Sequence, residues 1–129
     1  MSDGWASADR PLETAFDFFA NEFFDSLPEI TRDFLLQTAL LSHMTPSLAA
    51  AVTGNQHAAS ILGELHRRHF FTHRRDLGEV SYQYHALFRD FLLAKLIGLY
   101  SSQKYLATVR HAGDALIERG REEEAVELY

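Results

Sequence analysis

Seven histidines and no cysteine set the range of chemistry open to this 129-residue chain. His85 lies between a segment of strand-like alternation and a segment of helical periodicity, so we expect it at the start of a helix. A helix N-terminus favours anions, and an imidazole at that position adds a hydrogen-bond donor toward a phosphate. His85 is therefore the candidate phosphate-binding residue; the alternative is that it only caps or packs the strand–helix joint.

Three other histidines, His66, His69 and His73, have a spacing that suggests a metal site. His66 and His69 could share one face of a helix, but His73 falls in the following hairpin and no cysteine joins them. His69 also falls on the apolar stripe of its predicted helix, which favours a core histidine. We therefore expect no metal site.

The sequence lacks the motifs of the common enzyme classes. No Gly-x-x-x-x-Gly-Lys-Ser/Thr run is present, and the only lysines are Lys95 and Lys104, which excludes a self-contained P-loop ATPase. No Gly-x-Ser-x-Gly or His-Glu-x-x-His supports a hydrolase or a metalloprotease. We expect no enzyme activity, no catalytic residue and no cofactor held by this chain alone.

A basic cluster interleaved with aromatic residues covers residues 66–75. Its arginines are Arg67, Arg68, Arg74 and Arg75, and they support an alternative in which the chain binds DNA. A DNA-reading helix presents polar or basic side chains in its N-terminal half, whereas Arg67 and Arg68 lie at the far end of the predicted helix. Residues 1–66 also carry nine acidic against two basic residues, which disfavours contact with phosphates. Solvated arginines, or arginines packed against another module, are the commoner explanation.

Length and composition limit the fold and the location. With 129 residues, 47% of them hydrophobic, the chain can form one core and a small appendage. No apolar run approaches the roughly 18 residues needed to cross a bilayer, and the N-terminus lacks the features of a signal peptide. The absence of cysteine fits a reducing compartment, and the net charge of −6 argues against a general attraction to anionic lipid. We expect a cytoplasmic protein that does not contact membranes.

The periodicity of apolar residues predicts the helices that position these candidates. Residues 1–10 are polar and aperiodic, and we expect them to form a flexible lead-in, with helical spacing from Pro11 onward. Ser26 and Glu29 have the spacing of a capping box, with Pro28 in the first helical turn. The buried face of the helix that follows is expected to carry Ile30, Phe34, Thr38 and Leu41, flanked by Leu35 and Ala39.

Two short helices and a hairpin come next. Thr45 and Pro46 predict a helix over residues 46–53 that ends at Gly54, and Asn55 is expected to cap a helix running to about His69. Two helices joined around a glycine are typical of a helix-turn-helix. Alternation over residues 70–74 and 80–84, with turn residues between, predicts a β-hairpin. A closing helix is expected to turn six apolar residues inward: Leu87, Phe88, Phe91, Leu92, Leu96 and Leu99.

The predicted fold class is mainly α with a small β-hairpin. Residues 11–100 form a winged helix-turn-helix, and residues 101–129 form a tetratricopeptide-like helical hairpin with a break near Gly120. A lone helical hairpin cannot bury its own apolar face, because repeat arrays need about three units for stability. We therefore expect the chain to be part of a larger protein.

Three phrases resemble a known family: residues 18–28 (FFANEFFDSLP), 32–38 (RDFLLQT) and 82–92 (YQYHALFRDFL). They are similar to the segment that follows the nucleotide-binding module in MalT-like regulators of the LuxR family, which are ATP-dependent bacterial transcription activators of the STAND class. The resemblance implies a parent with an N-terminal P-loop ATPase, this winged helix, a tetratricopeptide-like helical sensor domain and a C-terminal LuxR helix-turn-helix that binds DNA. It also implies that residues 101–129 are the first repeat of that sensor domain.

The resemblance also implies a role for His85. Residues 85–90 are similar to the Met-His-Asp motif of related STAND switches, in which the histidine reaches the β-phosphate of bound ADP and latches the winged helix onto the nucleotide module. Tyr84 and Ala86 replace the Met and the Asp, so only the histidine carries over. Arg89 is a weaker candidate for nucleotide contact, the alternative being an ion pair with Asp90 or another neighbour.

The resemblance implies the partners as well. ATP and ADP bind in the parent, the partners of this chain are the parent's own ATPase module and sensor, and DNA is bound only through a C-terminal domain. The activated parent is expected to oligomerise. The function so implied is coupling of the nucleotide state to the sensor and the DNA-binding domain. The alternatives are direct DNA binding through residues 66–75 and a passive interdomain scaffold.

Overall fold

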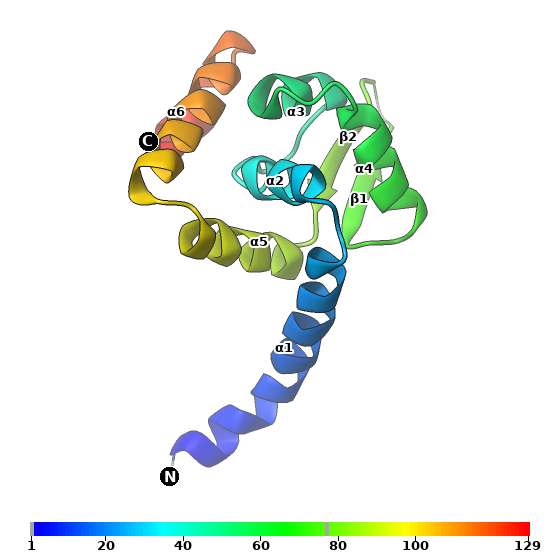
Figure 1. The fold of residues 1–129 in the computed structure, drawn as a ribbon, viewed down its shortest axis with the longest axis vertical. Helices are drawn as coiled ribbons and strands as arrows, with labels where there is room; N and C mark the ends of the chain where they lie inside the picture. Colours follow the sequence, from blue (N-terminus) through cyan, green and yellow to red (C-terminus); the bar gives the residue numbers. More distant parts are fainter. Residues whose placement is uncertain (1, 77) are drawn as a thin grey trace.

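The computed structural model describes residues 2–76 and 78–129, and the side chains of residues 14–76 and 78–129. The elements follow one another as α1 (Ser2–Asp25), α2 (Glu29–Thr38), α3 (Pro46–Thr53), α4 (Ala58–Arg67), β1 (Thr72–Arg75), β2 (Ser81–Tyr84), α5 (Ala86–Leu99), α6 (Ser102–Glu118) and α7 (Glu122–Leu128). Figure 1 shows α2 in the middle of the body, between α3 and α5, with α4 and the hairpin at one end and α6 at the other.

Helix α1 begins at Ser2, earlier than the predicted start at Pro11. The side chains of residues 1–13 lie outside the described part of the chain, so the flexible lead-in stays a prediction. The C-terminal half of α1 packs on the body: Ala20 and Phe24 are buried, and the Phe23 ring lies 4.3 Å from that of Phe70. Phe19, which helical spacing places on one face with Phe16, Phe23 and Leu27, is 64% exposed.

The start of α2 differs from the prediction. No capping box forms, because Ser26 donates its hydroxyl to the Phe23 carbonyl at 2.6 Å and so closes the end of α1, while Pro28 takes the N-cap position. Ile30 was expected in the core but is 67% exposed, since it lies in the first turn of a helix that begins only at Glu29. The remaining residues expected on this face, Phe34, Leu35, Thr38, Ala39 and Leu41, are buried.

The helix-turn-helix forms largely as predicted. The Thr45 hydroxyl accepts the Leu48 N–H at 3.1 Å and caps α3, which ends at Gly54 with φ of 71°. Asn55 does not cap α4; its side-chain oxygen accepts the N–H of His57, and His57 itself takes the N-cap position. Helix α4 ends at Arg67, and His69 is exposed with φ of 58°, so the prediction of a core histidine is wrong: the helix stops before its stripe reaches residue 69.

The hairpin docks on the helices through one face. Strands β1 and β2 pair antiparallel, with Thr72 opposite Tyr84 and Arg75 opposite Ser81. The Tyr82 and Tyr84 rings are buried, and the Tyr84 hydroxyl meets the Thr38 hydroxyl at 2.8 Å. A two-stranded hairpin is marginal on its own, so this docking is what stabilises the wing.

Helix α5 closes the core beneath α2 and the hairpin. Phe88, Phe91, Leu92 and Leu96 are buried as predicted. Leu87 and Leu99, also expected inside, are 43% and 62% exposed. Leu87 lies beside the buried face of the helix, whereas Leu99 shares that face but is the last residue of α5. Phe88 is the centre of an aromatic cluster with centroid distances of 5.2 to 6.2 Å to Phe23, Phe71, Tyr84 and Phe91.

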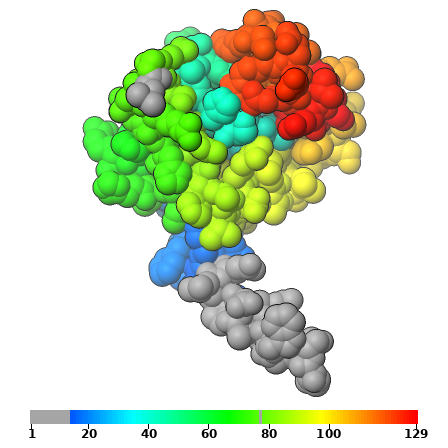
Figure 2. Space-filling model, turned by 180° about the vertical axis from the view of Figure 1, so that it is seen from behind, coloured from blue at the N-terminus to red at the C-terminus, as the bar shows by residue number. Residues whose placement is uncertain are grey.

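Helices α6 and α7 form the predicted helical hairpin, with Gly120 at φ of 74° between them. They pack against the winged helix rather than standing apart from it. His111 Nε2 lies 2.9 Å from the Ala51 carbonyl, and Arg119 hydrogen-bonds to the Ser47 carbonyl and hydroxyl. Figure 2 shows α6 and α7, in orange and red, covering the body on the side away from the green hairpin. The fold is therefore a mainly α winged helix with a helical hairpin docked on α3.

Candidate functional site

His85 lies at the junction that the sequence predicts. It follows β2 directly and is the N-cap of α5, where its Nδ1 accepts the Leu87 N–H at 3.2 Å. Its backbone N–H donates to the Phe71 carbonyl at 2.7 Å, which ties the joint to the start of the hairpin. Because Nδ1 accepts, a neutral ring carries its hydrogen on Nε2, and the residue is exposed. The imidazole therefore caps the helix and still has a donor for a ligand.

The first turn of α5 adds a positive electrostatic potential around His85. It holds no acidic residue, so the positive end of this 14-residue helix is not neutralised from within. The His73 ring, on the neighbouring strand, lies 6.0 Å from the His85 ring. Two imidazoles and a helix N-terminus on one exposed surface suit an anion better than a cation.

Arg89, the second candidate, faces the interior of the fold. Its Nε donates to the Ala39 carbonyl at 2.8 Å and its Nη2 to the Leu40 carbonyl at 3.3 Å. These carbonyls follow the last turn of α2, so the guanidinium satisfies acceptors that the helix leaves open. The side chain binds backbone carbonyls rather than the Asp90 carboxylate, and it ties α5 to α2.

The four arginines of the DNA-binding alternative do not gather on one surface. Arg67 and Arg68 both pair with Glu64, and Arg68 lies over the Phe70 ring. Arg74 pairs with Asp76 at 2.7 Å, a contact that raises the pKa of the guanidinium. Arg75, the next residue along β1, points to the opposite face of the strand. Three of the four guanidiniums are thus paired with carboxylates, which reduces their attraction for a DNA backbone.

The histidines of the proposed metal spacing are separated in the fold. His66 lies 6.5 Å from the Tyr82 ring, His69 follows the end of α4, and His73 faces His85. Within residues 14–76 and 78–129, no group of three or more His, Cys, Asp or Glu side chains could hold a metal ion. Nor does any helix in that part of the chain combine the length and the apolarity needed to cross a bilayer.

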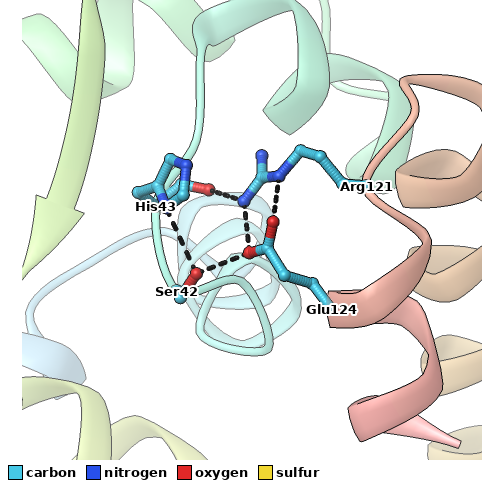
Figure 3. A network of polar contacts seen from close by, with 4 residues as sticks. All are labelled: Ser42, His43, Arg121 and Glu124. Carbon is cyan, nitrogen blue, oxygen red and sulfur yellow. Dashed lines mark hydrogen bonds and ion pairs between the residues drawn. The ribbon is translucent and has the colours of Figure 1, made fainter.

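A polar network at the base of the helical hairpin was not predicted from the sequence (Figure 3). Arg121 donates to the His43 carbonyl at 3.0 Å and to the Glu124 carboxylate at 2.6 Å, and Ser42 donates to the same carboxylate at 2.7 Å. Arg121 lowers the pKa of Glu124 to about 2, with the Ser42 hydroxyl contributing. The i, i+3 spacing of Arg121 and Glu124 was a local signal, but the loop they hold lies about eighty residues earlier in the chain.

An apolar groove runs between α1 and α5, beside the His85 junction. It has a volume of about 580 Å³, and Phe16, Leu87, Phe91 and Leu99 line it together with Asp90 and Lys95. Its walls include the two leucines of α5 that the sequence placed in the core. The exposed Leu87 and Leu99 thus belong to a surface rather than to the interior.

The geometry agrees with comparisons to known proteins. Residues 20–104 match the family model described as the MalT winged helix domain. Over 76 residues, or 59% of this chain, the sequence is 37% identical to the HTH-type transcriptional regulator MalT of Cronobacter sakazakii, and 36% identical to proteins of the same name from two strains of Klebsiella pneumoniae. The match spans 8% of the length of each relative. The family model covers more than half of the chain and all of the helix-turn-helix, hairpin and closing helix, and the chain belongs to the family of MalT winged helix domains.

Proposed function

We propose that the chain is the winged-helix part of a transcriptional regulator, in which it couples the nucleotide state of a P-loop ATPase module to a helical sensor. The relatives named above are HTH-type transcriptional regulators, and the match spans 8% of their length. In this proposal the parent binds ATP or ADP in another module, acts in the cytoplasm, binds DNA through a separate C-terminal domain and oligomerises when activated.

The observation that carries the proposal is the position of His85. Its ring is exposed at the N-terminus of α5, with Nδ1 engaged in the cap and Nε2–H left to meet a phosphate. One charge-assisted hydrogen bond contributes about 1.5–3 kcal/mol. That is enough to shift a two-state equilibrium about tenfold to a hundredfold. ADP would then hold the closed state, and its loss would release the winged helix.

A continuous series of polar contacts supports transmission from His85 to the helical hairpin. His85 begins α5, and one turn later Arg89 holds the Ala39 and Leu40 carbonyls at the end of α2. After Leu41, the residues Ser42 and His43 are held by Arg121 and Glu124 of the helical hairpin. A movement of the α5 N-terminus therefore has a route to α7 through hydrogen-bonded groups rather than through loose surface contacts. Such a route counts as coupling only when both ends respond together.

Two substitutions of His85 in the full-length parent separate phosphate binding from capping. His85→Ala removes both the cap acceptor and the imidazole. His85→Ser keeps a cap acceptor and removes only the Nε2–H donor that would meet a phosphate. We expect both variants to weaken ADP binding about tenfold or more and to raise basal transcription. Recovery of wild-type ADP affinity in His85→Ser would show that the residue is only a cap, and unchanged affinity in both variants would favour the passive scaffold.

A further inference from the structure

The outer face of the hairpin carries a set of polar residues that the proposed function does not use. Side chains alternate along the two strands, and the inner set, Thr72, Tyr82 and Tyr84, is buried on the helices. The outer set consists of two cross-strand pairs, His73 opposite Gln83 and Arg75 opposite Ser81. This outer face is what the wing presents away from the core.

A cavity of about 390 Å³ lies beside β2 and includes part of this face; it is lined by His43, Arg75, Ser81, Tyr82 and Gln83. His43 reaches it because its neighbour Met44 forms a bridge to Tyr82, with main-chain hydrogen bonds of 2.8 and 2.7 Å in the two directions. The segment before α3 thus lies beside β2, joined to it by this one isolated bridge. The volume is at the lower end of the range for small-molecule sites.

The lining offers donors and positive charge without a carboxylate. Its arginine differs from the one beside it: Arg74 is paired with Asp76, whereas the described residues give Arg75 no ion pair. The nearest acid of the adjoining network, Glu124, is already bound by Arg121 and Ser42. Because Ser42 gives its hydroxyl hydrogen to Glu124, it accepts from His43 Nδ1 at 3.2 Å, and this contact holds the imidazole in place.

We propose that this cavity binds a small oxyanion of the phosphate class. Arg75 supplies a planar pair of donors of the kind that phosphate accepts, and the Ser81 hydroxyl and the Gln83 amide supply neutral donors. The charged end of the site is separate from His85, since the Arg75–Ser81 pair lies four residues before His85 along β2, or about 13 Å away. The proposal stands whether or not His85 reads a nucleotide.

Titration of the chain of residues 1–129 with inorganic phosphate at constant ionic strength tests the site. Two-dimensional NMR is expected to show saturable shifts of the side chains of Arg75, Gln83 and His43, with a dissociation constant in the millimolar range or tighter. Arg75→Gln is expected to weaken binding at least tenfold and Arg75→Lys to weaken it less. Arg67→Gln is the matched control, because it removes an exposed arginine already paired with Glu64, and it should leave the affinity unchanged.

Shifts that rise linearly without saturation, or an Arg75→Gln variant that binds as tightly as the wild type, would overturn the proposal. Parallel titrations with pyrophosphate and with a short DNA duplex distinguish the sources of the anion. Tighter binding of pyrophosphate with the same Arg75 dependence supports the site and points to a free or nucleotide-derived phosphate. Binding only to DNA, weakened equally by Arg75→Gln and Arg67→Gln, would contradict it and favour the nucleic-acid alternative.

Discussion

The Thr38 and Tyr84 hydroxyls form a buried pair that joins α2 to the wing. Thr38 donates to the Phe34 carbonyl at 2.8 Å, so it accepts the hydrogen of Tyr84. Burial raises the pKa of Tyr84, which keeps the phenol neutral. The two hydroxyls differ in their number of hydrogen-bond partners. Thr38 also bonds to backbone carbonyls of its own helix, whereas Tyr84 is bonded to Thr38 alone among the described residues.

This asymmetry predicts an order of destabilisation. Tyr84→Phe removes one hydrogen bond and leaves no buried donor without a partner, so it should lower the free energy of unfolding by about 1 kcal/mol. Thr38→Val leaves the Tyr84 hydroxyl buried without an acceptor and should lower it by about 2–3 kcal/mol. Urea denaturation of both variants measures the difference. Equal losses, or a larger loss for Tyr84→Phe, would contradict the assigned donor directions.

Residue-scale prediction worked where the signal was local. His85 was placed at a helix start because the apolar period changes at that residue, and the structure puts it at the N-cap. Arg89 could not be placed, because its partners are main-chain carbonyls 49 and 50 residues away and carry no sequence signal. The role of the exposed imidazole toward a nucleotide remains a prediction.

At the scale of elements, two predicted helix caps should differ in how much they stabilise the fold. Thr45→Ala removes an observed cap of α3 and should lower the free energy of unfolding by about 1 kcal/mol. Ser26→Ala should lower it by less than about 0.5 kcal/mol, because the hydroxyl is exposed and caps no helix start. Thermal or urea unfolding of the two variants makes the comparison. A loss for Ser26→Ala as large as that for Thr45→Ala would show that the capping box forms after all.

The same contrast explains which elements were predictable. Helix α3 was predicted at its observed bounds because its cap and its left-handed glycine both lie within one turn of it. The start of α2 was missed because Ser26 and Glu29 match the capping-box pattern, yet the hydroxyl finds a carbonyl of the preceding helix. The docking of α7 was missed because it depends on a loop far away in the sequence.

Docking of the helical hairpin should depend on pH through Glu124. A carboxylate whose pKa is lowered in the folded state contributes stability that is present above its ordinary value of 4.5 and is lost as pH falls toward the folded value of about 2. Solvent screening of this half-buried group reduces the contribution to about 1 kcal/mol. The wild type should therefore exceed Glu124→Gln in stability at pH 7, and the gap should close between pH 4.5 and 2.

Chemical denaturation of the wild type and Glu124→Gln across this range measures the gap. A matched control is Glu127→Gln, which removes an exposed acid from the same helix and should show little difference at any pH. A gap that stays constant from pH 7 to pH 2 would mean that the charge of Glu124 does not contribute to docking.

At the scale of the whole molecule, the winged helix and the helical hairpin are packed together rather than tethered. The segment between α2 and α3 touches both: its Met44 pairs with β2, and its Ser42 and His43 are bound by Arg121 and Glu124. We propose that a change at the α5 N-terminus reaches α7 through these contacts. The central claim is that a nucleotide contact at His85 changes the stability of this interface.

Hydrogen–deuterium exchange of the full-length parent with ADP and with ATP tests that claim most directly. We predict that ADP slows exchange both at the His85 junction and in residues 42–45 and 122–128, and that His85→Ser abolishes the ADP effect at all of these sites. Protection by ADP that is confined to the hairpin, or that persists unchanged at residues 122–128 in His85→Ser, would contradict the account.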